Sequence, residues 1–395
     1  MVELINHGVY LLNGTEIRDN YQGMTPDEAR ENTITYGILR SHDVDGGKGN
    51  KMRIRFDAMM SHDITYVGII QTARASGLEE FPLPYAMTNC HNSLCAVGGT
   101  INEDDHVFGL SAAKKYGGIY VPANQAVIHQ YAREMMVKCG NMILGSDSHT
   151  RYGSLGNMGV GEGGGELVKQ LLKNTWDINA PEVVLVWLEG APKKGVGPHD
   201  VAISLVKATF ESGVVKNKVL EFAGPGVKNL PIDFRNGIDI MTTETTCLSS
   251  IWITDDEVKH HYEIHERPQD YRELKPGDVA YYDMMIRIDL STQESMIALP
   301  FHPSNAVTIH ELQADPVGIL TRIEEDAKKR FGDKVDVHLV DKVVDGKVQA
   351  DQGIIAGCSG GTYDNLAEAA AILKGNNIGN DYFTASAYPQ STPVS

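Results

Sequence analysis

The stretch LGSDSHTRYGSLGNMGVGEGGGE, residues 144–166, combines an acid, an imidazole and a run of glycines. Asp147 and His149 stand two residues apart, and His129 lies 18 residues before Asp147 in the segment VIHQ. A carboxylate that pairs with an imidazole can carry a proton to or from a substrate near neutral pH. Glycines directly after such a pair let the backbone approach a ligand closely. The stretch therefore indicates either a catalytic turn or a flexible loop with two incidental polar residues.

Two further residues have types that could join this chemistry. Glu244 lies in DIMTTETTCLSS, and Cys358 lies in AGCSGGTYDNLAEAAA, where a turn of small residues precedes a strong helix. A thiol ahead of a helix N-terminus feels the positive end of the helix dipole, which favours the thiolate that ligates iron or attacks a substrate. The alternatives are that Cys358 is a small buried core residue and that His129 is an ordinary core or surface histidine.

These residues need elements that hold them in place, and strand-like segments alternate with helix-like ones along the chain. The strand-like segments are NMILG (141–145), EVVLVWLEG (182–190), KVLEFAG (218–224), YYDMMIRIDL (281–290), KVDVHLV (334–340) and GIIAG (353–357). The helix-like segments, each with an apolar stripe and a closing Gly, are PHDVAISLVKATFESG (198–213) and TYDNLAEAAAILKG (362–375). The alternation predicts an α/β protein with parallel sheets, in which ligands bind beyond the carboxyl ends of strands.

Size and charge narrow the class of function. A chain of 395 residues is long enough for about two or three domains. Its net charge of −17 repels nucleic acid and anionic membranes, so the sequence argues against a function that depends on binding either of them. The apolar run VVLVWL (183–188) is too short to span a bilayer, and no secretory signal opens the sequence. Five cysteines without a dense framework are typical of a reducing compartment, so we expect a cytoplasmic protein.

Several of these segments together resemble the aconitase superfamily of iron–sulfur hydro-lyases, which includes isopropylmalate dehydratase large subunits. GSDSHT with its glycine run, and VIHQ upstream, resemble the family's segments at the same interval. The other similar segments follow in family order: HDIT (62–65), EFAGPGV (221–227), LPFHPSNAV (299–307) and AGCSGGTYDNLAEAA (356–370). The resemblance implies aconitase-like α/β domains over residues 1–182 and 183–300 and part of a third over 301–395, each a mainly parallel sheet flanked by helices.

The resemblance also implies a cofactor and a set of residue roles. In the family a [4Fe–4S] cluster is held by three cysteines, and its fourth iron binds the substrate hydroxyl and carboxylate as a Lewis acid. The implied catalytic residues, among which His129 pairs with Asp147, are His129, Asp147, His149 and Glu244. The implied substrate contacts are His62, Asn92, Ser93 and Ser148, and the implied metal ligand is Cys358. The implied activity is a hydro-lyase reaction on a hydroxy di- or tricarboxylate.

The segment TNCHNSLC (88–95) departs from the family pattern. In the family an Asp-His pair in a THCDHL-like segment protonates the departing hydroxyl. We align Asn92 and Ser93 with that pair, and neither exchanges a proton readily near neutral pH. His91 could substitute if the turn is shifted. The alternative function is therefore a catalytically degenerate binding or regulatory protein.

A second departure concerns the cluster. The family's other two cluster cysteines form a C-x-x-C motif, and no C-x-x-C occurs in this sequence. One cysteine cannot hold a cubane cluster. We therefore expect a truncated chain that is inactive and cluster-free by itself, with the missing C-terminal domains in the same or another chain.

Three weaker signals have ordinary explanations. Cys90, His91 and Cys95 are zinc-ligand types, but their spacing is not a standard ligand pattern. The Asp105-His106 pair is expected on a solvated helix face. The terminal stretch AYPQSTPVS (387–395) is typical of a loose end.

Overall fold

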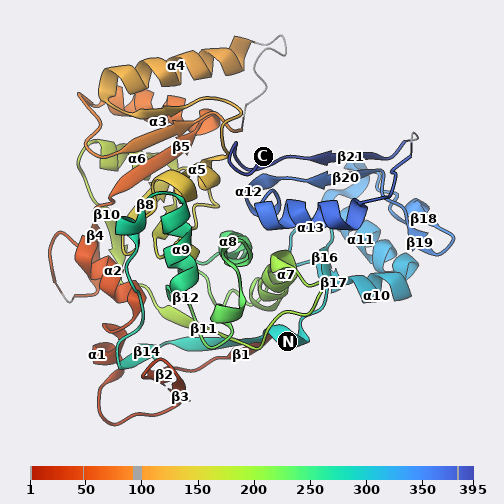
Figure 1. Cartoon of the computed structure of the whole chain (residues 1–395), viewed down its shortest axis with the longest axis horizontal. Helices are drawn as coiled ribbons and strands as arrows, with labels where there is room; N and C mark the ends of the chain where they lie inside the picture. Colours follow the sequence, from red (N-terminus) through yellow and green to blue (C-terminus); the bar gives the residue numbers. More distant parts are fainter. Residues whose placement is uncertain (1, 48, 92–99, 380–381) are drawn as a thin grey trace.

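The computed structural model describes residues 2–47, 49–91, 100–379 and 382–395 (Figure 1). Two five-stranded sheets, each flanked by helices, form most of the molecule, and smaller two- and three-stranded sheets surround them. The predicted α/β class with parallel sheets is confirmed. In the described part of the chain, no helix combines the length and the apolar character needed to cross a bilayer.

The first large sheet is parallel throughout and has the strand order β7-β6-β5-β8-β9. Its strands are β5 (Ala58–His62), β6 (Tyr85–Thr88), β7 (Ile119–Val121), β8 (Met142–Gly145) and β9 (Met158–Gly161). Its helices are α3 (Asp63–Ala75), α4 (Thr100–Tyr116), α5 (Ile128–Met135) and α6 (Gly164–Leu171). Helix α3 packs against α4 and α6, whereas α5 packs against β5 (Figure 1). The strand order reverses between the adjacent strands β5 and β8, so the sheet has a topological switch point there.

The second large sheet has the order β1-β15-β11-β12-β13, with only the edge strand β1 antiparallel to its neighbour. Its strands are β1 (Val2–Ile5), β11 (Val183–Glu189), β12 (Val219–Ala223), β13 (Ser249–Trp252) and β15 (Met284–Asp289). The accompanying helices are α7 (Pro198–Thr209), α8 (Ile232–Met241) and α9 (Asp256–Ile264). Strands β11, β12 and β13 are buried along nearly all of their length because both faces of the sheet are covered.

The remaining elements form small layers around the two large sheets. Near the N-terminus these are β2 (Val9–Leu12), β3 (Glu16–Arg18), α1 (Pro26–Arg30), α2 (Ile34–His42) and β4 (Lys51–Ile54), with partners β10 (Trp176–Asn179) and β14 (Val279–Tyr282). Toward the C-terminus they are β16 (Met296–Ala298), β17 (Ala306–Thr308), α10 (Ile309–Ala314), α11 (Pro316–Phe331), β18 (Val343–Val344), β19 (Lys347–Val348), β20 (Gln352–Ile355), α12 (Gly357–Gly360), α13 (Tyr363–Leu373) and β21 (Thr384–Ala387).

Polar contacts join the two large sheets. Ser249 of β13 donates its hydroxyl to the carbonyl of Gly159 in β9 at 2.7 Å. The carboxylate of Glu221, fully buried in β12, accepts hydrogen bonds from the backbone of Ile34 and Thr35 and from the Tyr282 hydroxyl. A buried carboxylate is tolerated when several donors satisfy it, so Glu221 fixes the start of α2 on the second sheet. The proposed domain boundaries after residues 182 and 300 remain predictions.

Most of the predicted elements are present, and two predictions are wrong. The segments 141–145, 182–190, 218–224, 281–290 and 353–357 contain strands, and 198–213 and 362–375 contain helices. Residues 334–340, all of them described, contain no strand. They are mostly exposed and find no neighbouring strand, and without backbone partners an alternating Val pattern does not make a sheet. The terminal stretch is not loose, because Gln390 and Ser391 are buried.

Candidate functional site

Three polar segments meet beyond the carboxyl ends of β5, β6 and β8, at the switch point of the first sheet. His62 is the last residue of β5, Cys90 and His91 follow β6, and Asp147 follows β8. Parallel strands place their carboxyl ends at one edge, where side chains from neighbouring strands converge. The chain thus assembles this site from residues more than 80 positions apart because the sheet brings their strands side by side.

The carboxylate of Asp147 lies where these segments meet, and histidine side chains from several segments surround it. Its Oδ1 accepts hydrogen bonds from His129 Nε2 at 2.9 Å and from the backbone N–H of His149 at 2.8 Å. Its Oδ2 lies 3.5 Å from His62 Nε2 and 3.4 Å from His91 Nε2. Burial by itself would raise the pKa of Asp147, but the surrounding histidines hold it well below its usual range. The carboxylate is therefore ionised at neutral pH.

His129 is held rigidly between two partners. Helix α5 presents its ring so that Nε2 faces Asp147, while Nδ1 lies 3.1 Å from the hydroxyl of Tyr152. Burial lowers the pKa of His129 to about 4, against the opposing effect of Asp147. A neutral ring that donates from Nε2 to the carboxylate must accept at Nδ1, so Tyr152 is the donor. His129 therefore acts on Asp147 as a neutral, fixed donor.

His149 and Glu244 form the second pair of the site. Nε2 of His149 lies 3.1 Å from Oε1 of Glu244, which the 3-10 turn Thr242–Thr245 carries at the end of α8. Hydrogen bonds with Asp147 and Glu244 raise the pKa of His149 to about 9, and the bond from His149 lowers the pKa of Glu244. At neutral pH the pair is an imidazolium beside a carboxylate.

His302, which the sequence reasoning left without a role, supports Glu244, and His91, which it considered as a substitute acid and as a zinc-ligand type, supports Asp147. His302 lies 3.6 Å from Oε2 of Glu244, and its ring stacks on Phe210 with centroids 3.7 Å apart. The contacts of His91 with Asp147, at 3.4 Å, and with the Cys90 thiol, at 3.3 Å, raise its pKa to about 10. His302 occurs in the quoted segment LPFHPSNAV, so its imidazole was the available sequence signal.

Cys358 lies in the four-residue helix α12, at the opposite side of the site. Burial raises the pKa of its thiol to about 11, against the lowering effect of Arg133. The expectation that a helix dipole favours the thiolate is therefore wrong for this isolated thiol, because desolvation outweighs it. Gln390 donates to the carbonyls of Gly357 and Cys358, at 3.0 and 2.6 Å, and so fixes the turn.

A cavity of about 240 Å³ connects these groups. Its polar and thiol lining comes from Cys90, His91, His129, Asp147, His149 and Cys358. Glu244 stands behind His149, and Ser148 is exposed beside it. The structure therefore brings together His62, His129, Asp147, His149, Glu244 and Cys358 of the residues that the sequence singled out. Asn92 and Ser93 lie outside the described residues.

The alignment of TNCHNSLC needs a correction that the sequence itself supplies. Counted from Thr88, His91 stands at the Asp position of THCDHL and Asn92 at the His position.

The expectation that the Asp105-His106 pair lies on a solvated helix face is wrong for His106. Its side chain is buried and lies 3.1 Å from Asp63.

The glycines around the turn make room for its own backbone. A Cβ at Gly161 would collide with the carbonyl oxygen of Asp147, and one at Gly145 would collide with the side chain of Thr150. The turn from Asp147 to Thr150 thus packs directly against β8 and β9. This close packing, more than flexibility, explains why glycine occurs at these two positions.

The thiol groups of the described residues do not by themselves complete a [4Fe–4S] site. Of the described cysteines, Cys90 and Cys358 line the cavity, whereas Cys139 and Cys247 are buried and donate to the carbonyls of Leu155 and Thr242. A cubane cluster needs three or four cysteine ligands. The nitrogen and oxygen donors at the cavity outnumber its sulfur donors.

Comparison with known proteins agrees with the geometry. The chain is 26% identical over 387 residues to the mitochondrial aconitate hydratase of Schizosaccharomyces pombe, and the aligned region covers 92% of this chain and 46% of that protein. It is 27% identical over 277 residues to the 3-isopropylmalate dehydratase large subunit 2 of Archaeoglobus fulgidus, and this aligned region covers 70% of this chain and 58% of that protein. A similar match, 26% over 273 residues, is found with the large subunit 1 of Thermotoga maritima.

The chain spans about half the length of the curated relatives that it matches. The family model described as the aconitase family (aconitate hydratase) matches residues 36–395, which include every site residue described above. With the cavity at the switch point and this match over most of its length, the chain belongs to the aconitase family.

Proposed function

We propose that this site catalyses an aconitase-type hydro-lyase reaction, the reversible removal of water from a hydroxy di- or tricarboxylate. One observation carries the proposal: acid and imidazole groups from three separate segments, around His129, around Asp147 and His149, and around Glu244, meet with Cys358 at or beside one cavity. The names of the relatives, aconitate hydratase and 3-isopropylmalate dehydratase, support the reaction class.

The charge at the cavity is compatible with an anionic substrate. The chain as a whole carries −17, yet at the cavity the imidazolium groups of His91 and His149 offset the carboxylates of Asp147 and Glu244. A site whose charges are balanced admits a small polycarboxylate, whereas the negative surface repels large polyanions. This local balance explains how a strongly acidic protein can take an acidic substrate.

The chain's own residues supply a proton donor for the departing hydroxyl. His149 carries a proton at neutral pH and holds it beside Glu244, and it is partly exposed to the cavity. As the C–O bond breaks, His149 gives this proton to the hydroxyl, which departs as water, while a base elsewhere in the whole protein takes the proton from the neighbouring carbon so that the double bond forms. Glu244 holds the ring of His149 in place. Asp147 is kept ionised by His129 and orients the backbone of His149.

A [4Fe–4S] cluster in the whole protein would supply a Lewis acid for the substrate hydroxyl, with Cys358 as one thiolate ligand. The described thiols of this chain do not complete such a cluster, so none of the steps above depends on it.

The activity is tested with the full-length gene product, prepared without oxygen and assayed by the ultraviolet absorbance of the substrate double bond. Hydration of aconitate and dehydration of 3-isopropylmalate are assayed first, followed by dehydration of other hydroxy di- and tricarboxylates. We expect Glu244→Gln to lower kcat/KM by about 10²–10⁴-fold, because it removes the partner of the acid. Glu211→Gln, at an exposed position after α7, is the control and should leave kcat/KM unchanged. The proposal is overturned if the full-length gene product neither hydrates nor dehydrates any of these substrates, or if the Glu244→Gln variant is fully active.

We also propose that further domains, in the same or another chain, cover the C-terminal part of this structure. Large apolar side chains are exposed there, among them Ile372 at 75% and Tyr382 at 92%. The parallel pair β20–β21 has no third strand among the described residues, although parallel sheets are normally covered. Slower amide exchange in β20 and β21 of the full-length product than in the 395-residue chain is the expected result, and equal exchange would contradict it.

A further inference from the structure

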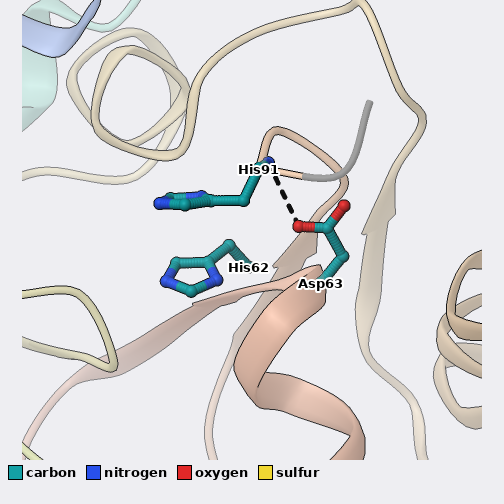
Figure 2. Close-up of side chains that lie close together, drawn as sticks. All are labelled: His62, Asp63 and His91. Atoms are coloured by element: carbon teal, nitrogen blue, oxygen red, sulfur yellow. Dashed lines mark hydrogen bonds between the residues drawn. The ribbon is translucent and has the colours of Figure 1, made fainter. Parts of the chain in front are cut away.

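His62 and His91 stack at the switch point and point in the same direction (Figure 2). Their ring centroids lie 3.6 Å apart, and donor atoms of His62, Asp63 and His91 lie within 4.8 Å of one another. Both Nε2 atoms approach one oxygen, Oδ2 of Asp147. We propose that His62, His91 and Asp147 bind one divalent transition-metal ion of the Zn²⁺ class through these three atoms.

The distances fit shared ligation better than hydrogen bonding. The two Nε2–Oδ2 distances are 3.5 and 3.4 Å, whereas N–H···O hydrogen bonds are about 2.7–3.2 Å long. In a tetrahedral zinc site with bonds of about 2.0–2.1 Å, neighbouring ligand atoms are about 3.3–3.4 Å apart. The distances from Oδ2 of Asp147 to the two Nε2 atoms are thus close to the spacing of ligands around one small ion.

The two oxygens of Asp147 are used differently. Oδ1 is saturated by short hydrogen bonds from His129 Nε2 and from the backbone of His149. Oδ2 has the two long contacts with His62 and His91 and no short hydrogen bond from a described residue. A carboxylate that ligates a metal through one oxygen is typically held by hydrogen bonds at the other. His129 therefore has the position of a residue that orients a ligand.

The ring of His62 supplies an independent observation. Its residue is only 5% exposed, and its Nδ1 is buried without a hydrogen-bond partner in the described structure. Buried polar side chains normally have their hydrogen bonds made within the protein. The other ring nitrogen of His62, Nε2, faces the carboxylate of Asp147 at 3.5 Å, so this is the atom through which the ring can bind a cation.

Asp63 holds the site from behind and is not itself a ligand. It is completely buried, and its Oδ1 accepts the backbone N–H of His91 at 3.1 Å (Figure 2). Its Oδ2 lies 3.1 Å from Nε2 of His106. Asp63 thereby fixes the segment that carries His91. It is a positioning residue.

Two imidazoles and one carboxylate leave coordination positions open toward the cavity. Such a set is typical of mononuclear catalytic sites, in which the ion binds water or substrate oxygen as a Lewis acid. The chemistry at those open positions rests on the proposed hydro-lyase function, but binding of the ion does not. The described thiols at the cavity are those of Cys90 and Cys358, and this nitrogen–oxygen set needs no sulfur donor.

The test titrates the chelator-treated chain with Zn²⁺ alone in a calorimeter, against a competing chelator of known affinity. Co²⁺ is used in parallel, since its visible absorption bands report the coordination number. We expect one ion per chain and the strong bands of four- or five-coordinate Co²⁺. His62→Gln and His91→Gln should each weaken Zn²⁺ binding by more than about 100-fold, whereas Asp63→Asn should weaken it by about 10–100-fold, as loss of a positioning residue does.

His310→Gln, an exposed histidine on α10, is the matched control and should leave binding unchanged. Thermal melting of each variant separates loss of the site from loss of the fold. Absence of stoichiometric binding, or binding that survives both histidine substitutions, overturns the proposal. Binding abolished by Cys358→Ser alone would place the ion on sulfur and also overturn it. If the full-length product binds Zn²⁺ through these residues but has no hydro-lyase activity, only the proposed function is refuted.

Discussion

Arg133 is a buried cation whose positive charge has no evident partner among the described residues. It is fully buried on α5, four residues after His129, and its Nη1 reaches the carbonyl of Cys358 at 3.3 Å. Its Nε and Nη2 have no hydrogen-bond partner in the described structure. The sequence signal was the i, i+4 spacing, which places Arg133 and His129 on one helix face. A buried cation with unmet donors destabilises the fold, while its positive charge favours anionic groups at the cavity.

Replacing Arg133 tests this balance. Arg133→Met keeps most of the volume and removes the poorly paired charge, so the free energy of unfolding should remain the same or increase. Arg235→Met is the matched comparison, because Arg235 is equally buried but pairs with Asp255 through two bonds of 2.8 and 2.7 Å. That variant should lose about 3–5 kcal/mol in urea unfolding. An equal loss in both variants would show that Arg133 is paired after all.

At the scale of elements, α2 is stabilised by opposite charges at its two ends. The Glu221 carboxylate accepts the N–H groups of Ile34 and Thr35 at the N-terminus. At the C-terminus, His42 Nδ1 bonds to the carbonyl of Ile38 and Nε2 lies 2.8 Å from Asp57. An anion at the start and a cation at the end of a helix both complement its dipole.

The charge at the end of α2 predicts a pH dependence. Burial and the nearby Arg272 would lower the pKa of His42, but the bonds with Asp57 and Ile38 raise it above its ordinary 6.5. The stabilisation from protonated His42 is therefore fully present below pH 6.5 and is lost as pH rises through the higher folded pKa. His42→Gln should lower the free energy of unfolding more at pH 6 than at pH 9, relative to the wild type. A pH-independent difference would show that His42 does not titrate with folding.

At the scale of the whole molecule, the C-terminal stretch joins parts of the site that are far apart in sequence. The Gln390 carbonyl accepts the N–H of Val127 just before α5, and its side chain binds the Cys358 turn. The Ser391 hydroxyl donates to Glu134 on α5 at 2.6 Å. Figure 1 shows the C-terminus returning beside α12. The stretch thereby fixes Cys358 relative to His129.

Removing the Gln390 side chain should loosen this connection. Gln390→Ala leaves two carbonyls without their donor, at a cost of about 1–3 kcal/mol, and Cys358 should alkylate roughly 5- to 100-fold faster. Peptide mass spectrometry measures Cys358 directly, with the buried Cys139 as internal reference. Gln349→Ala, whose side chain is exposed, is the control. An unchanged alkylation rate would show that other contacts hold the turn.

Local patterns in the sequence were enough for most strands and helices, and for the group of His129, Asp147, His149, Glu244 and Cys358. Apolar periodicity reports which face of an element is buried, and a motif reports residue types at fixed spacing. Both are properties of short segments. For this reason the valines of 334–340 misled, since a strand also needs a partner that the local pattern cannot show.

Only the tertiary structure decided which groups face one another. The stacking of His62 on His91, the burial of Arg133 and His106, and the role of Gln390 depend on contacts between distant segments. The same is true of charge: burial raises the pKa of Cys358, although its place before a helix had favoured the thiolate. Desolvation and convergence arise when the sheets close around the cavity, so the sequence specified the chemical groups and folding set their protonation and their partners.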